Sequence, residues 1–155
     1  MTSGRNEHRS HTAGVRRRCW DPTQAAALAD KRILVVDDDP DTRLLLRLIF
    51  AKTKAVVKEA ASADDAFASL RDFRPQLVIS DIDMPVEDGC SLMRRIRELA
   101  AEGGGLTPAI ALTANEGSSA RRKALNAGFT AYLEKPVAVA SLIETALSVT
   151  QAAPA

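Results

Sequence analysis

The chain has 155 residues, enough for one domain with a sizeable hydrophobic core and with little room for a second. Hydrophobic residues make up 46% and charged residues 26%, which is ordinary for a soluble globular protein. The net charge is +1, but residues 1–20 hold five Arg and one Glu, a local charge of +4, so residues 21–155 sum to −3. This mildly acidic remainder argues against nucleic-acid binding by the core.

Cysteine and histidine are scarce, with two of each, and three of these four residues lie among the first twenty. We therefore expect no zinc site in the globular part. One possible cysteine pair does not indicate a disulfide framework, so a reducing cytoplasm is the simpler interpretation. No apolar run reaches membrane-spanning length, and no apolar segment follows the N-terminal arginines as in a signal peptide. The sequence thus predicts a cytoplasmic protein that does not enter a membrane.

The ends of the chain differ in composition from its middle. Residues 1–30 are rich in Arg, Ser, Thr and Ala without hydrophobic periodicity, and we expect a disordered basic tail there. The basic cluster at 16–18 could contact nucleic acid, an acidic partner or a membrane surface, although a solvated leader is the simpler interpretation. The globular domain is expected over residues 31–151, followed by a short C-terminal tail at 152–155.

From residue 31 onward, short apolar runs alternate five times with helical patterns. The expected strands are 33–36, 56–57, 77–80, 109–112 and 131–133. Asp39 can cap the first helix with Pro40 in its first position, and Leu45, Leu48 and Ile49 form the expected apolar stripe. Ser62, with Asp65 three residues on, is expected to begin the next helix. Later helices are expected over 92–99, before 128 and over 139–147. Five βα units predict an α/β fold, (βα)5, with a doubly wound parallel five-stranded sheet of flavodoxin-like order 2-1-3-4-5.

Reactive groups of such sheets gather beyond the carboxyl ends of the strands. The first strand ends in the acidic run 37–39, the third in Asp81 and the fourth in Thr113, while Lys135 follows the fifth. Clustered carboxylates repel one another unless a cation neutralises them, and Mg²⁺ favours a few carboxylates together with a phosphate oxygen. Lys135 adds a compact positive charge and Thr113 a hydroxyl donor. Such a site can hold a phosphoryl group, and a carboxylate nucleophile can form an aspartyl-phosphate.

Four motifs, each at an expected strand end, resemble the signature of two-component response-regulator receivers, of the single-domain kind with a chemotaxis-regulator-like fold. The motifs are Val35-Val36-Asp37-Asp38, Asp81-x-x-Met84-Pro85-x-x-x-Gly89, Leu112-Thr113-Ala114 and Lys135-Pro136. The resemblance runs from about residue 32 to residue 147. It implies phosphorelay signal transduction, in which Asp81 becomes a 4-aspartylphosphate by transfer from a phosphohistidine of a sensor histidine kinase or a histidine phosphotransfer protein.

The resemblance also implies roles for the residues around Asp81. Asp38 would bind Mg²⁺ directly and Asp37 through water, beside Asp81 itself and the backbone carbonyl of Asp83. Thr113 and Lys135 would hold the phosphoryl oxygens, and the Lys135-Pro136 peptide would be cis. Tyr132 would change rotamer together with Thr113 as a switch. The protein would be a phosphoacceptor switch with self-catalysed transfer and slow autodephosphorylation, not an enzyme. Asp83 and Asn115 are hypothesised to set the rate of that hydrolysis.

Two other functions are open to this sequence. Asp81-Ile82-Asp83 superficially matches the nucleophile motif of haloacid-dehalogenase-like phosphatases, but Pro85 stands where that family expects Thr or Val, and its nucleophile follows the first strand. The chain could also be a receiver-fold interaction module that is independent of phosphorylation, although the acidic cluster, Thr113 and Lys135 argue against this. A free-standing regulator and a receiver from a hybrid sensor kinase both fit the motifs.

Overall fold

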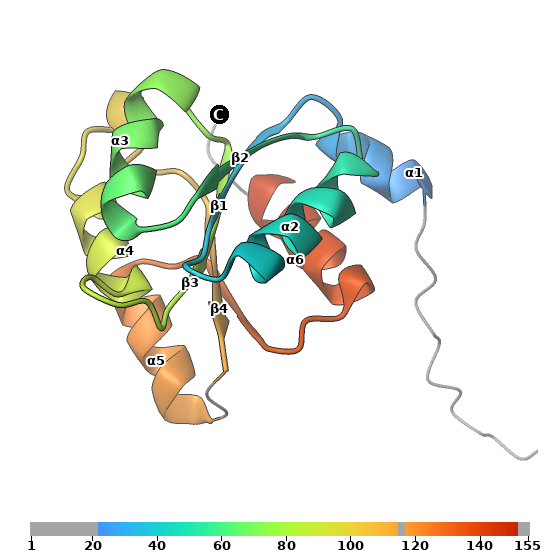
Figure 1. The fold of residues 1–155 in the computed structure, drawn as a ribbon. Helices are drawn as coiled ribbons and strands as arrows, with labels where there is room; N and C mark the ends of the chain where they lie inside the picture. Colours follow the sequence, from blue (N-terminus) through green and yellow to red (C-terminus); the bar gives the residue numbers. More distant parts are fainter. Residues whose placement is uncertain (1–21, 115–116, 152–155) are drawn as a thin grey trace, which may run out of the picture.

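The computed structural model describes residues 22–114 and 117–151. Its elements, drawn in Figure 1, follow in chain order: α1 (Pro22–Ala25), η1 (Ala26–Leu28), β1 (Arg32–Val36), α2 (Pro40–Ala51), β2 (Val56–Ala60), α3 (Ala63–Phe73), β3 (Leu77–Asp81), α4 (Gly89–Arg97), η2 (Ala101–Gly103), β4 (Ala109–Thr113), α5 (Ser118–Ala127), β5 (Ala131–Glu134) and α6 (Val139–Gln151).

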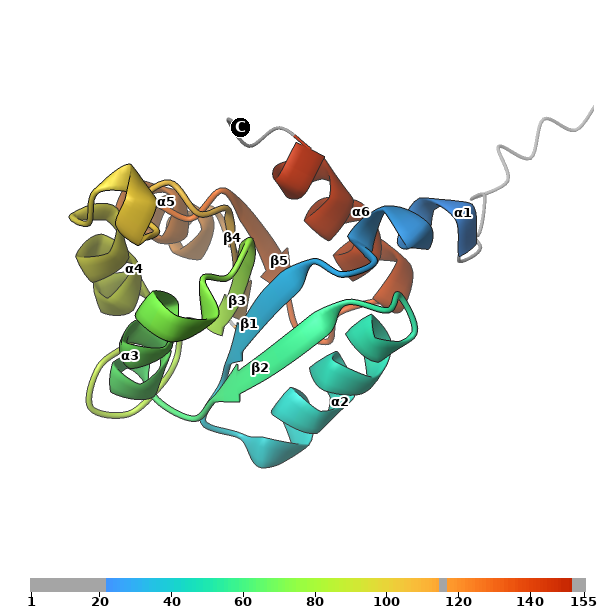
Figure 2. The same cartoon turned by 90° about the horizontal axis from the view of Figure 1, so that it is seen from above.

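The five strands form one parallel sheet in the order β2-β1-β3-β4-β5. The chain passes from one strand to the next through a helix, as parallel neighbours require, and the order reverses between β1 and β3 (Figure 2). The expected fold class and strand order are confirmed. The reversal leaves a crevice at the carboxyl ends of β1 and β3, which is where the sequence places its acidic residues.

Helices cover both faces of the sheet, with α3, α4 and α5 on one side and α2 and α6 on the other (Figure 1). Side chains of β1 alternate between the two layers, so that Leu34 and Val36 join the first core while Ile33 and Val35 join the second. All four are buried, which explains why β1 reads as a continuous apolar run and not as an alternating one.

Two helix starts form as the sequence predicts. The carboxylate of Asp39 accepts a hydrogen bond from the Asp41 amide, with Pro40 in the first helical position, and the Ser62 hydroxyl accepts one from the Asp65 amide. These bonds satisfy amide groups that the first helical turn leaves without partners. Asp39 is therefore a helix cap, and the chain turns abruptly from the acidic loop into α2.

The buried face of α2 differs from the predicted one. Leu45 and Leu48 are 56% and 52% exposed, whereas Leu46, Ile49 and Phe50 face the core. Both sets have helical spacing, so periodicity alone could not choose between them. The second set packs in the core formed by the α2 and α6 layer, and only this contact selects it.

The expected tail also contains an ordered segment. Residues 22–28 form α1 and η1, and Leu28 is fully buried in the core under α2 and α6. Ala25 and Leu28 of this segment are both buried, so part of the range expected as a tail packs against the domain. Residues 1–21 and 152–155 lie outside the described residues. Across 22–114 and 117–151, no helix has the length and apolar character needed to cross a membrane.

Candidate functional site

Four strand ends bring the predicted site residues to one edge of the sheet. Asp37 and Asp38 follow β1, Asp81 is the last residue of β3, Thr113 is the last residue of β4, and Lys135 follows β5. The strands are in register there, since Val36 pairs with Ser80, Asp81 with Leu112 and Thr113 with Glu134. Parallel pairing thus converts residues almost a hundred positions apart into neighbours.

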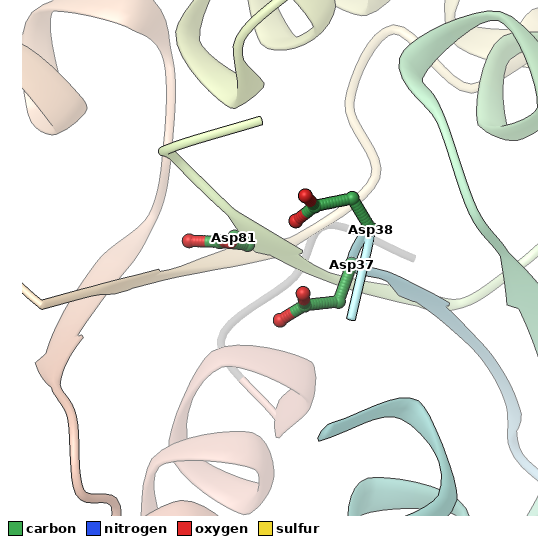
Figure 3. A group of neighbouring side chains, drawn as sticks. All are labelled: Asp37, Asp38 and Asp81. Carbon is green, nitrogen blue, oxygen red and sulfur yellow. The ribbon is translucent and has the colours of Figure 1, made fainter. Parts of the chain in front are cut away.

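Three carboxylates form a compact acidic cluster in the crevice. Asp37, Asp38 and Asp81 each place a carboxylate oxygen within 4.8 Å of the others, and Figure 3 shows the three as neighbouring side chains at the ends of β1 and β3. Asp37 and Asp81 are buried, at 1% and 5% exposure, whereas Asp38 is exposed at the mouth of the crevice. One face of the cluster is therefore open to a ligand that arrives from solvent.

Lys135 supplies the positive charge of the site. Its Nζ donates to Asp37 Oδ2 at 3.1 Å and lies 3.5 Å from Asp81 Oδ1. The Lys135 amide donates to the Thr113 carbonyl at 2.7 Å, which ties the loop after β5 to the end of β4. The Lys135-Pro136 peptide is cis, as the resemblance implied.

The electrostatics of the site are visible in two shifted pKa values. Burial raises the pKa of the Asp81 carboxyl, and the negative charge of Asp37 raises it further, against the opposing effect of Lys135. Burial acts to lower the pKa of Lys135, but the carboxylates of Asp81 and Asp37 outweigh it and the net shift is upward. The cluster therefore holds more negative charge than one ammonium group neutralises.

A hard divalent cation fits this arrangement. Mg²⁺ takes oxygen ligands, tolerates a site with few carboxylates and keeps several waters, and the exposed side of the cluster leaves space for them. The raised pKa of Asp81 also favours a bound cation. Burial and the charge of Asp37 disfavour the ionised carboxylate, and a nearby cation would relieve the repulsion from Asp37. Asp37, Asp38 and Asp81 are the side chains that could hold the ion.

The comparisons with known proteins agree with this geometry. The sequence model of one protein family, the response regulator receiver domain, matches residues 33–147. This chain belongs to that family. An uncharacterized 14.6 kDa protein in the sodA1 3′ region of Leptolyngbya boryana is 47% identical over 116 residues, which span 75% of this receiver and 87% of that protein. The receiver is also 37% identical over 117 residues to the sensor histidine kinase RcsC of Salmonella typhi, of which it spans only 12%.

A solved structure of similar fold is the receiver domain of the sensor histidine kinase PA1611 from Pseudomonas aeruginosa PAO1, with a magnesium ion coordinated in its active site cleft. The two share 31% sequence identity with a TM-score of 0.72, over 80% of this receiver and 100% of that chain. The chain is a receiver domain of phosphorelay signal transduction, and the expectations of family, fold and signalling class are confirmed.

The structure describes three other predicted residues of the receiver, Asp83, Thr113 and Tyr132. The Asp83 amide donates to Asp81 Oδ1 at 3.2 Å, and its own side chain is exposed and is not among the three clustered carboxylates. Thr113 is buried at the end of β4. Tyr132 packs its half-buried ring against the core on the α3–α5 side, with its hydroxyl 3.5 Å from Glu134 Oε1. Asn115, which the sequence paired with Asp83, lies outside the described residues.

Sequence reasoning missed one contact that the tertiary structure makes. Arg43, on the first turns of α2, donates from Nη1 to the backbone carbonyl of Asp37 at 2.6 Å. Its Nε lies 3.7 Å from Oε1 of Glu59 on β2. The only available signal was the position of Arg43 one turn beyond the helix start at Pro40, which does not reveal what the guanidinium reaches.

Proposed function

We propose that Asp81 is the phosphoacceptor, and that it receives the phosphoryl group from a phosphohistidine of a sensor histidine kinase or a histidine phosphotransfer protein. The observation that carries the proposal is the position of its buried carboxylate, 3.5 Å from Lys135 Nζ and within the acidic cluster of a receiver-family chain. A nucleophile, a cation and an open face to solvent are the parts that phosphoryl transfer needs.

The transfer follows from these positions. A carboxylate oxygen of Asp81 attacks phosphorus while the bond from phosphorus to the histidine nitrogen breaks, and that nitrogen leaves with the bonding electron pair. Lys135 neutralises charge on the phosphoryl oxygens, and the Thr113 hydroxyl donates to one of them. Attack of water on the acyl phosphate later restores the Asp81 carboxylate and releases inorganic phosphate, a slow reaction that returns the switch to its first state.

The proposed metal site consists of Asp37, Asp38 and Asp81, with the backbone carbonyl of Asp83 as a further ligand. The bound Mg²⁺ would supply positive charge to the carboxylates and the phosphoryl oxygens. The proposal is supported by the 4.8 Å clustering and by the raised pKa of Asp81. The magnesium ion named for the related PA1611 receiver domain supports it as well.

The proposed readout involves Thr113 and Tyr132. Both lie on the last two strands, with Thr113 buried at the carboxyl end of β4 and the half-buried Tyr132 ring packed against the core on the α3–α5 side of the sheet. A Thr113 side chain that turns toward the phosphoryl group would free space for the ring, and the two states would present different surfaces to a partner. A cytoplasmic location is proposed with this function, and the buried free thiol of Cys90 is consistent with a reducing compartment.

Labelling by acetyl phosphate tests the phosphoacceptor. Wild type should gain one phosphoryl group in the presence of Mg²⁺, measured by intact mass, and Asp81→Asn should gain none. Asp39→Asn is the matched control, because Asn still caps α2 and should label like wild type. Labelling of Asp81→Asn would refute the assignment, and an unlabelled wild type would favour an interaction module independent of phosphorylation. Sustained turnover of a generic phosphomonoester would instead favour a phosphatase.

A further inference from the structure

The two adjacent aspartates after β1 are held very differently. The carboxylate of Asp37 accepts from the Asp39 amide at 2.9 Å through Oδ1 and from Lys135 Nζ at 3.1 Å through Oδ2. Across the described ranges, no hydrogen bond or ion pair holds the carboxylate of Asp38, which is exposed. The direction of the Asp38 side chain therefore depends on the backbone that carries it.

That backbone is fixed from both sides. The Asp37 amide donates to the Ala60 carbonyl at 3.2 Å, and the Asp37 carbonyl accepts from Arg43 Nη1 at 2.6 Å. The Asp37 carbonyl and the Asp38 amide belong to one planar peptide group, so a bond that fixes this carbonyl also fixes the start of Asp38. Without it, the peptide plane could rotate at the point where β1 pairing ends and turn Asp38 away from the cluster.

The Arg43 side chain is in turn held in place by contacts with β2. Its side chain is 18% exposed, and its Nε lies 3.7 Å from Oε1 of Glu59, a β2 residue whose register partner is Val35. Oε2 of the same carboxylate lies 3.6 Å from Nε of Arg47. A planar guanidinium can reach the Asp37 carbonyl and the Glu59 carboxylate at once, and a lysine ammonium at the end of a flexible stem is poorly suited to bridge them.

We propose that Arg43 is a positioning residue for the metal site, which acts through the Asp37–Asp38 peptide and is anchored by Glu59. The inference rests on the proposed function, because it concerns the Mg²⁺ that Asp38 would bind. The direction in which Mg²⁺ affinity changes when Arg43 is removed distinguishes a positioning role from a purely electrostatic one. Arg43 is a cation beside a cation site, so removing it should tighten Mg²⁺ binding if only long-range electrostatics mattered. Positioning predicts the opposite.

Calorimetric titration with Mg²⁺ on unphosphorylated protein tests the inference. Arg43→Ala should raise the Mg²⁺ dissociation constant about tenfold, the usual effect of losing a group that orients metal ligands. Arg43→Lys should recover part of the loss, since an ammonium can still donate to the carbonyl. Arg47→Ala is the matched control, because Arg47 contacts the same glutamate but not Asp37, and its dissociation constant should equal that of wild type or be lower.

The outcomes separate this inference from the metal site itself. If wild type binds Mg²⁺ and Asp38→Asn weakens the binding, the site stands, and unchanged or tighter binding by Arg43→Ala would overturn the role of Arg43 alone. If wild type does not bind Mg²⁺, both fall. Urea unfolding without Mg²⁺ reports whether each variant folds. Should Arg43→Ala not fold, Glu59→Gln is the second variant, because it removes the ion pair that anchors Arg43 while keeping the side-chain volume similar. A Glu59→Gln protein with the wild-type Mg²⁺ dissociation constant would overturn the inference.

Discussion

Gly89 begins α4 directly behind the proposed phosphoacceptor, and it leaves no room for a side chain. A Cβ at this position would lie 2.2 Å from the backbone oxygen of Asp81 and 3.0 Å from Cα of Ile82. Ordinary van der Waals contact begins at 3.4 Å, so the two backbones would have to separate by 3.4 minus 2.2, or 1.2 Å. The substitution Gly89→Ala is therefore expected to move Asp81 relative to Lys135.

The magnitude follows from two effects. Forcing a methyl group into packed backbone costs about 1–3 kcal/mol of unfolding free energy, and we expect the upper part of that range because both contacts are backbone atoms. Misplacement of a reacting group by about 1 Å can cost on the order of 100-fold in rate. Gly89→Ala should therefore label with acetyl phosphate about 100-fold more slowly per folded molecule.

Two other glycines serve as controls for this experiment. Gly105→Ala would put a Cβ 1.9 Å from the Leu99 carbonyl oxygen, an equally severe clash at the opposite end of β4, so it should destabilise the fold without slowing labelling of the folded fraction. Gly103→Ala would meet only Leu99 Cβ at 3.6 Å and should change neither quantity. The reasoning is refuted if folded Gly89→Ala labels at the wild-type rate, or if Gly105→Ala slows labelling as much.

Two further predictions concern stability. Burial and Asp37 raise the pKa of Asp81 in the folded state, so ionisation of Asp81 destabilises the fold. This loss of stability is absent below the ordinary pKa of 3.8 and grows as pH rises through the raised pKa of the folded state. Asp81→Asn should thus be more stable than wild type at neutral pH without Mg²⁺, by urea unfolding, with the difference vanishing below pH 3.8; a pH-independent difference would contradict this. Val86 adopts a left-handed φ of 70° with its side chain fully exposed, so Val86→Asn should raise the unfolding free energy by about 1 kcal/mol without altering labelling, and a loss of stability would argue against strain at this loop.

Much of the site could be predicted because its chemistry sits at strand ends. Buried parallel strands read as apolar runs, and the residue that ends each run is placed by the sheet and not by its own preferences. Asp37, Asp38, Asp81, Thr113 and Lys135 were identified in this way, and the structure brings them to one edge of the sheet. Their roles in binding metal and phosphoryl oxygens stay proposals that the labelling and titration experiments test.

The sequence by itself determined the order of the five strands and of the helices between them, the helix caps at Asp39 and Ser62, and which residues follow the apolar runs, because these depend on neighbours within a few positions. Only the tertiary structure decided which face of α2 is buried, that Leu28 joins the core, and that Arg43 reaches the Asp37 carbonyl. These contacts join segments whose patterns allow several partners of similar quality. Which of these partners a side chain contacts depends on how the helices pack against the sheet, and this packing cannot be predicted from local sequence preferences.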